Sequence, residues 1–317
     1  MKKPKNAGML SQFFLIASWF AITLVSGVMY RMVLVATNFE FPCMILLCQS
    51  IACLFFIQVS KLLFPDLCKS WSTSIDLKAL PVSIFLTISL FLDLFGYYQE
   101  TGCSKLIEYL AAPTIAIILL RSSISQRPKF GKKIPLILSC FSVIFTYMTI
   151  NVTELTPDGM LFGTMILVFN VSTFFTLRSY LKRNSISQFL FSHFSFLTVI
   201  LFVYELYQHD IHRLYLYIHL WQLPNFYSVL FTYVFLFSTS LVSLCHVITK
   251  FDLSLIAASL NTKNAWQFVI TNFFFRNVVF KPYYDLNPSM CVNALSSFVV
   301  TLTKFWIDFR NRSSQIY

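Results

Sequence analysis

Pro157 to Tyr207 reads PDGMLFGTMILVFNVSTFFTLRSYLKRNSISQFLFSHFSFLTVILFVYELY. Two apolar runs, residues 159–181 and 187–207, are separated by a short polar segment that contains Lys182 and Arg183. Each run has roughly the 20 residues that a helix needs to cross a bilayer. The connection is too short for a domain of its own, so this stretch predicts two membrane-spanning helices joined by a basic loop.

The same pattern repeats along all 317 residues, of which 57% are hydrophobic and only 12% are charged. A soluble domain carries about 25% charged residues, so this chain has too few to cover a water-facing surface. Together these features predict an all-α integral membrane protein. Ten segments are long and apolar enough to span the bilayer: residues 12–35, 42–63, 79–99, 103–121, 134–151, 159–181, 187–207, 225–247, 253–275 and 287–308.

The basic residues predict the orientation of these ten helices. Most of the 24 Lys and Arg lie in every second connection and at the two ends of the chain, whereas the other connections hold only Arg213, Arg276 and Lys281. Lys and Arg are retained on the cytoplasmic side of membrane proteins. Both termini are therefore expected in the cytoplasm, which requires an even number of spans. The net charge of +11 is distributed in short runs and does not indicate a nucleic-acid binder.

Ten spans divide into two units of five, residues 1–151 and 152–317, which together make one membrane domain. A duplicated unit with an odd number of spans must insert its second copy upside down, as in many transporters. Tyr109-Leu-Ala-Ala-Pro113 in the fourth span and Leu255-Ile-Ala-Ala-Ser259 in the ninth are the corresponding element of each unit. We therefore expect two inverted five-helix repeats.

Modification and metal sites are sparse. The eight cysteines form no CxxC pair and read as packing residues, and no cofactor or metal is expected. His209 and His212 have the spacing of zinc ligands but lack further ligands nearby, so a wet loop is the preferred interpretation. The sequon Asn151-Val-Thr lies on the predicted lumenal side and is a candidate glycosylation site.

The informative residues are the charged ones at membrane depth, because a charge at a helix centre costs about 2.5–3.5 kcal/mol on insertion scales. They are Arg31, Asp93, Lys105, Glu108 and Lys263. Lys105 and Glu108 could simply pair on one helix face, and Arg31 could reach the interface. Taken together, cations in the first, fourth and ninth spans favour a central cavity for an anionic ligand that carries phosphate.

Local motifs resemble the nucleotide-sugar transporters of the drug/metabolite transporter superfamily over nearly the whole chain. The stretch Cys103 to Pro113, CSKLIEYLAAP, is similar to the S-K-x-L-x-Y-L-x-x-P of the GDP-mannose branch. Cys48 to Cys53, CQSIAC, is similar to the family's Gln-Ser pattern in the second span. Residues 258–262, ASLNT, stand where that branch has G-A-L-N-K, a motif that contacts the nucleotide.

The resemblance implies antiport of a cytosolic nucleotide sugar against a lumenal nucleoside monophosphate in the Golgi or endoplasmic-reticulum membrane. Arg31, Lys105 and Lys263 would neutralise the diphosphate. Tyr30 and Tyr109 would contact base and sugar. The remaining polar contacts would come from His193, Ser259, Asn261 and Thr262. The sequence leaves undecided whether two copies of the chain form a homodimer.

Some of the family's selectivity residues are replaced. Leu119 and Leu120 stand where the family has Lys-Asn, Thr262 replaces the lysine of G-A-L-N-K, and residues 190–193, LFSH, stand in place of F-Y-N-N. The substrate therefore stays open between GDP-mannose and a UDP-sugar. A non-transporting scaffold or chaperone with the same fold is one alternative. A sugar or lipid transferase that uses Glu205, His209, Asp210 and His212 is a weaker one, because the chain carries no catalytic motif.

Overall fold

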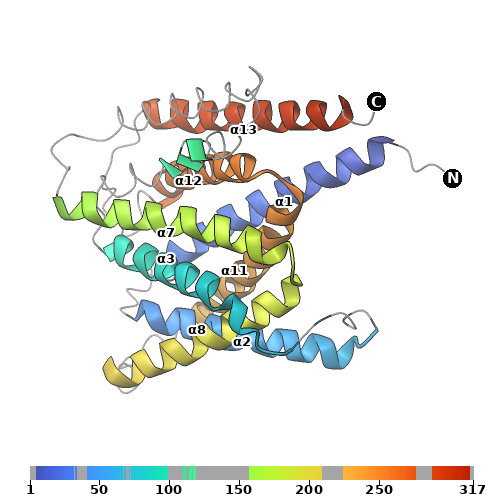
Figure 1. The fold of residues 1–317 in the computed structure, drawn as a ribbon. Helices are drawn as coiled ribbons and strands as arrows, with labels where there is room; N and C mark the ends of the chain where they lie inside the picture. The colour runs from blue at the N-terminus through green and yellow to red at the C-terminus, as the bar shows by residue number, and fades with distance from the viewer. Residues whose placement is uncertain are drawn as a thin grey trace.

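The computed structural model describes residues 5–31, 33, 41–66, 68, 71, 73–98, 110–111, 114–115, 117–118, 157–208, 224–275 and 288–314. Every secondary-structure element that it describes is helical, which confirms the all-α class. The helices are α1 (Lys5–Arg31), α2 (Pro42–Leu63), the short η2 (Leu77–Ala79), α3 (Leu80–Tyr98), α7 (Pro157–Leu181), α8 (Ile186–Gln208), α11 (Pro224–Lys250), α12 (Leu253–Phe275) and α13 (Pro288–Ser314) (Figure 1). The predicted spans 103–121 and 134–151 fall outside the described residues, apart from a few positions between 110 and 118.

Five helices of the described part are long and apolar enough to cross a membrane: α1, α2, α7, α8 and α11. Shorter apolar stretches lie at Leu77–Leu92 and Ala294–Ile307. Large apolar side chains point outward from several helices, and Phe14, Phe55, Val203 and Phe231 are each 60–63% exposed. A soluble surface avoids such residues in quantity, whereas lipid accommodates them. Multiple apolar helices with apolar exteriors fit a multi-pass membrane protein.

Proline and serine mark where the helices begin. Pro42, Pro157, Pro224 and Pro288 are the first residues of α2, α7, α11 and α13. Proline suits this position because its missing N–H would have no partner in the first turn. Before α8, Ser185 accepts a hydrogen bond from the Gln188 N–H at 3.3 Å, as a capping side chain does.

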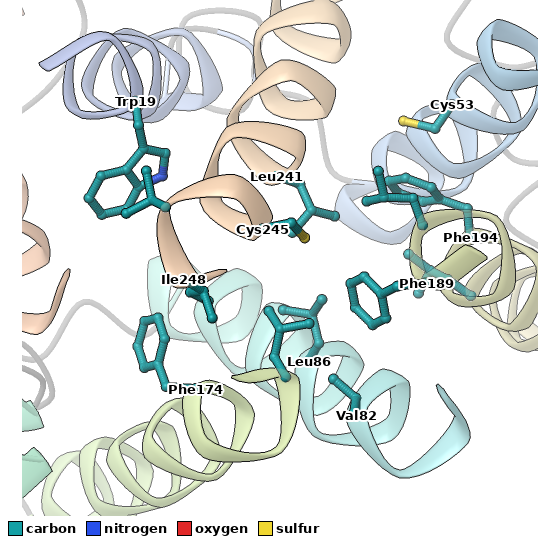
Figure 2. Packing of buried hydrophobic residues seen from close by; sticks show 14 of the residues in the cluster. Trp19, Cys53, Val82, Leu86, Phe174, Phe189, Phe194, Leu241, Cys245 and Ile248 are labelled. Carbon is teal, nitrogen blue, oxygen red and sulfur yellow. The ribbon is translucent and has the colours of Figure 1, made fainter. Parts of the chain in front are cut away.

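α11 is the central helix of the described bundle, because it contacts α1, α2, α7, α8 and α12. The most extensive pairings are α1 with α11, α3 with α7, α2 with α8, and α12 with α13. Phe189, Leu241, Cys245 and Ile248 project from α8 and α11 into one apolar core, together with Leu86 of α3 (Figure 2). In a bilayer such packing, rather than escape from water, is what holds helices together.

Contacts between polar side chains bring several connections to one end of the bundle, which we call the basic end. Lys61 at the end of α2 donates to Thr73 Oγ1 at 3.1 Å. The Tyr180 hydroxyl at the end of α7 donates to Asp76 Oδ2 at 2.7 Å. Arg178 of α7 lies 3.6 Å from Asp252, between α11 and α12.

Aromatic contacts connect α1 and α13, the first and last helices of the chain, near the junction between α11 and α12. The ring of Phe305, near the end of α13, lies 5.8 Å from that of Phe13, near the start of α1. The same ring lies 6.5 Å from Phe251, immediately before α12. The first turns of α1 and the last turns of α13 are thus both close to the basic end.

Candidate functional site

The structure describes six of the predicted substrate-binding side chains: Tyr30, His193, Ser259, Asn261, Thr262 and Lys263. Arg31 is the last residue of α1, and the position of its side chain is outside the described part. Lys105, Tyr109 and the sequon residue Asn151 are also outside it. The predicted convergence of the first, fourth and ninth spans can therefore be followed only for α1 and α12.

Tyr30 occupies the interface between α1 and α11. It is buried, and its ring lies 5.3 Å from that of Tyr233, with 37° between the ring planes. Two turns earlier on α1, Thr23 Oγ1 lies 2.9 Å from Ser240 Oγ of α11. Since residue numbers rise on one helix as they fall on the other, α1 and α11 are antiparallel. Tyr233 was not singled out from the sequence, because nothing in an isolated aromatic residue of an apolar run marks it.

α1 and α12 approach each other closely at Gly27. A Cβ atom built on Gly27 would lie 2.5 Å from Oε1 of Gln267, so a residue with a side chain would displace that amide. Gln267 is buried, and Lys263 lies one helical turn before it on the same side of α12, partly buried. The predicted cation of the ninth span thus lies on the side of α12 that approaches α1.

The hydroxyl of Thr262 joins α12 to α13, whereas that of Ser259 bonds within α12. Thr262 Oγ1 lies 2.8 Å from the Ser297 carbonyl oxygen and 2.8 Å from Thr301 Oγ1, both on α13. It also lies 3.0 Å from the Ala258 carbonyl oxygen in its own helix. Ser259 Oγ donates to the Leu255 carbonyl oxygen at 2.9 Å. The hydroxyls of both residues are therefore engaged in the helix framework.

A second lysine lies near this interface on α13. Lys304 follows Thr301 by three residues, on the side that meets α12, and it is buried. By its sequence position Lys304 belongs to the basic C-terminal end of the chain. Asn261 is buried as well. Lys263 and Lys304 therefore lie on different sides of α12: Lys263 on the side that approaches α1, and Lys304 on the α13 surface that meets α12.

The ring contacts of His193 are with residues of its own helix, α8, rather than with α1 or α12. Its imidazole stacks on Phe189 at 5.7 Å with 9° between the planes and lies 5.3 Å from Phe194, all within α8. It is fully buried, and neither ring nitrogen has a hydrogen-bond partner among the described residues. The structure thus places His193 in an aromatic environment rather than beside the other described candidates.

The Gln-Ser pattern of the second span faces the bundle interior. Ser50 accepts a hydrogen bond from Thr198 of α8 at 2.9 Å, and Gln49 beside it is buried. No hydrogen bond to the Gln49 amide is found in the described part of the chain. A buried amide without hydrogen bonds costs free energy. The Gln49 side chain is therefore able to bond a polar group that enters the bundle.

Of the residues considered for a transferase, the structure describes Glu205 alone. Glu205 belongs to the last turn of α8 and is fully buried, whereas His209, Asp210 and His212 lie outside the described residues. Within the described ranges, no three His, Cys, Asp or Glu side chains gather in a way that could hold a metal ion.

Comparison of the chain with models of protein families gives no match, and comparison with curated proteins gives none either.

Proposed function

We propose that this chain is a transporter of the nucleotide-sugar type, which exchanges a nucleotide sugar for a nucleoside monophosphate by alternating access. Its two inverted halves would surround a site between α1, α11 and α12. Both termini would be cytoplasmic, in a Golgi or endoplasmic-reticulum membrane. The proposal joins the motif resemblance of the sequence with the arrangement of the described helices.

The observation that carries the proposal is a symmetry in which helices contact which. If α1, α2 and α3 are exchanged with α7, α8 and α11, most of the observed pairings map onto one another; the α7–α11 contact, which would map onto α1 with α3, has no counterpart of similar extent. α1 packs along α11 just as α7 packs along α3, and α2 packs on α8 in a pairing that the exchange leaves unchanged. The α3–α8 and α2–α11 contacts exchange with each other, as do α2–α3 and α8–α11. Such reciprocity supports two inverted repeats.

The helix directions also support inversion. α7 runs toward the basic end, where Tyr180 and Arg178 lie, whereas α1 starts near that end and runs away from it. Equivalent first helices of the two halves thus run in opposite directions. Because the basic end collects the Lys and Arg of the connections, we assign it to the cytoplasm.

The candidate site matches the chemistry of such a substrate. Lys263 would bind the diphosphate, and the Tyr30–Tyr233 pair would contact base or sugar. Asn261 and Gln267 would add neutral hydrogen bonds. Arg31, Lys105 and Tyr109 remain part of the proposal through the family resemblance alone.

The test is an exchange assay with purified protein in liposomes preloaded with a nucleoside monophosphate. Uptake of labelled GDP-mannose or a UDP-sugar should depend on the internal nucleotide. Lys263→Ala should reduce exchange about tenfold or more, because a charged hydrogen-bond partner is lost. Lys182→Ala, an exposed lysine at the basic end, is the matched control. Unchanged exchange in both Lys263→Ala and Arg31→Ala would show that the residue roles are wrong, and no exchange with any tested nucleotide sugar would defeat the function.

One observation favours a scaffold of the same fold as the second candidate. In the segment that resembles the nucleotide motif, the Thr262 hydroxyl is used for packing against α13, and the Ser259 hydroxyl bonds within its own helix. A scaffold would need only that packing. The two candidates separate in a thermal-shift experiment with GDP, GMP, UDP and UMP, where a transporter gains stability on binding and a scaffold does not.

A further inference from the structure

Asp76 connects three parts of the bundle at the basic end. Its backbone N–H donates to Ser192 Oγ of α8 at 2.8 Å, and its Oδ2 accepts from the Tyr180 hydroxyl of α7 at 2.7 Å. Its Oδ1 accepts from the Lys78 N–H at 3.0 Å and so caps η2, directly before α3. One residue thus joins the entrance of α3 to the last turn of α7 and the first turns of α8.

The hydrogen bonds of Asp76 lie next to the apolar core, at its basic end. The Tyr180 ring lies 5.8 Å from that of Phe189, and Phe189 is fully buried. Phe189 points into the same core region as Leu86, Leu241 and Cys245 (Figure 2). Cys245 has no exposed surface, so solvent cannot reach it while the basic end is closed.

The bonds are of a kind that can open and close. The Tyr180 hydroxyl, followed by the Lys78 N–H, lowers the pKa of the Asp76 carboxyl, so Asp76 is ionised at neutral pH. Asp76 is partly exposed, and water can replace each partner when the bonds break. The net free energy of such hydrogen bonds is small, because water replaces the partners when the bonds break, and this suits a reversible contact.

We propose that Asp76, Tyr180 and Ser192 form a latch that holds the basic end closed and opens when the core becomes accessible from that side. The inference rests on the proposed alternating access, because it gives the latch its role. The latch belongs to both proposed halves: Asp76 comes from the first half, and Tyr180 and Ser192 come from the second. Rocking of the halves toward an opening at the basic end must therefore separate Asp76 from its two partners.

The test measures access to the native Cys245 and needs no transport substrate. The full chain in lipid nanodiscs, with both faces open to solvent, is treated with a membrane-impermeant maleimide, and modification of each cysteine is followed by peptide mass spectrometry. The double variant Tyr180→Phe, Ser192→Ala should raise the rate of Cys245 labelling at least threefold. Cys43, buried in the first turn of α2 at the opposite end, should keep its rate.

The matched control is the double variant Tyr207→Phe, Ser195→Ala, which makes the same chemical changes on α8. Tyr207 is 80% exposed, and the Ser195 hydroxyl donates within its own helix, to the Phe191 carbonyl oxygen at 2.8 Å, with no bond to another helix among the described residues. This control should label like the wild type.

An unchanged Cys245 rate in the latch variant would overturn the proposal. If Cys43 and Cys245 accelerate together, the fold has loosened, and the single variants Tyr180→Phe and Ser192→Ala then decide. At least one of them must accelerate Cys245 without accelerating Cys43, and failure of both overturns the latch. Because labelling is independent of exchange, a responsive Cys245 in a protein that exchanges no nucleotide would refute the transport function and leave the latch standing.

Discussion

His193 shows most clearly how a single residue can work against stability. Its imidazole is fully buried, stacks on Phe189 and has no hydrogen bond to any described residue. A buried polar group without a partner costs free energy that an apolar ring of similar shape would not. Groups that weaken a fold in this way concentrate where function requires them.

Replacing this histidine by phenylalanine should therefore stabilise the protein. We expect His193→Phe to raise the unfolding free energy by about 1 kcal/mol, since the desolvation cost of the imidazole disappears. The measurement is the thermal unfolding midpoint in detergent, with His246→Phe, an exposed position on α11, as control. A lowered midpoint for His193→Phe alone would show that the imidazole has a partner beyond the described residues.

At this scale the sequence could indicate which residues are polar at membrane depth, but not what they contact. Thr262 and Lys263 are neighbours in one motif, yet the Thr262 hydroxyl meets α13 while Lys263 lies on the side that approaches α1. The difference comes from the 100° rotation between successive helical residues and from which helix packs on each side. Tyr233 and Lys304 were missed for the same reason, because their significance depends on the partner helix.

Helices were easier to predict than contacts. The predicted spans 42–63, 159–181, 187–207 and 253–275 agree with α2, α7, α8 and α12 within two residues at either end. Proline, serine or charged residues end each apolar run sharply. α1 begins earlier and α13 ends later than expected, because backbone hydrogen bonding continues into polar turns that hydropathy does not register.

The hydrogen bonds between α12 and α13 predict how much stability the Thr262 hydroxyl contributes. Thr262→Val keeps the shape of the side chain but removes the hydroxyl that meets Ser297 and Thr301. Hydrogen bonds between membrane helices contribute about 1 kcal/mol, so the unfolding midpoint should fall correspondingly.

The control for that variant is Thr232→Val on α11. Thr232 is exposed in part, and the one bond its hydroxyl makes within the described ranges is to the Ser228 carbonyl oxygen of its own helix at 2.7 Å. Equal losses in the two variants would mean that the α12–α13 bond adds nothing to stability.

In the described part of the molecule, helices from residues 1–151 interleave with helices from residues 152–317. The main partner of α1 is α11, and that of α3 is α7, so the most extensive described contacts of residues 1–151 are with residues 152–317. The division into two five-helix units stays a prediction of the sequence, and these long-range contacts could not be predicted, because pairing between distant helices leaves no local pattern.

Interleaving predicts that neither unit is stable alone. Expressed separately, residues 1–151 should be degraded much faster than the whole chain, because the surfaces of α1 and α3 that face α11 and α7 have no partner. Coexpression with residues 152–317 should restore the lifetime and allow a tag on one unit to recover the other. Pulse-chase labelling measures both effects. An isolated first unit as long-lived as the intact chain would contradict the arrangement.

The prolines that begin α2, α7, α11 and α13 have a consequence for the surrounding lipid. All four helices run toward the basic end, so their first residues lie at the opposite face. The residue before a proline disfavours helical geometry, so none of these helices can lengthen there by recruiting preceding residues. A thicker bilayer must then be met by tilt or by local thinning, at a cost that grows with each ångström of mismatch. Membranes of different thickness are therefore unequal environments for this protein.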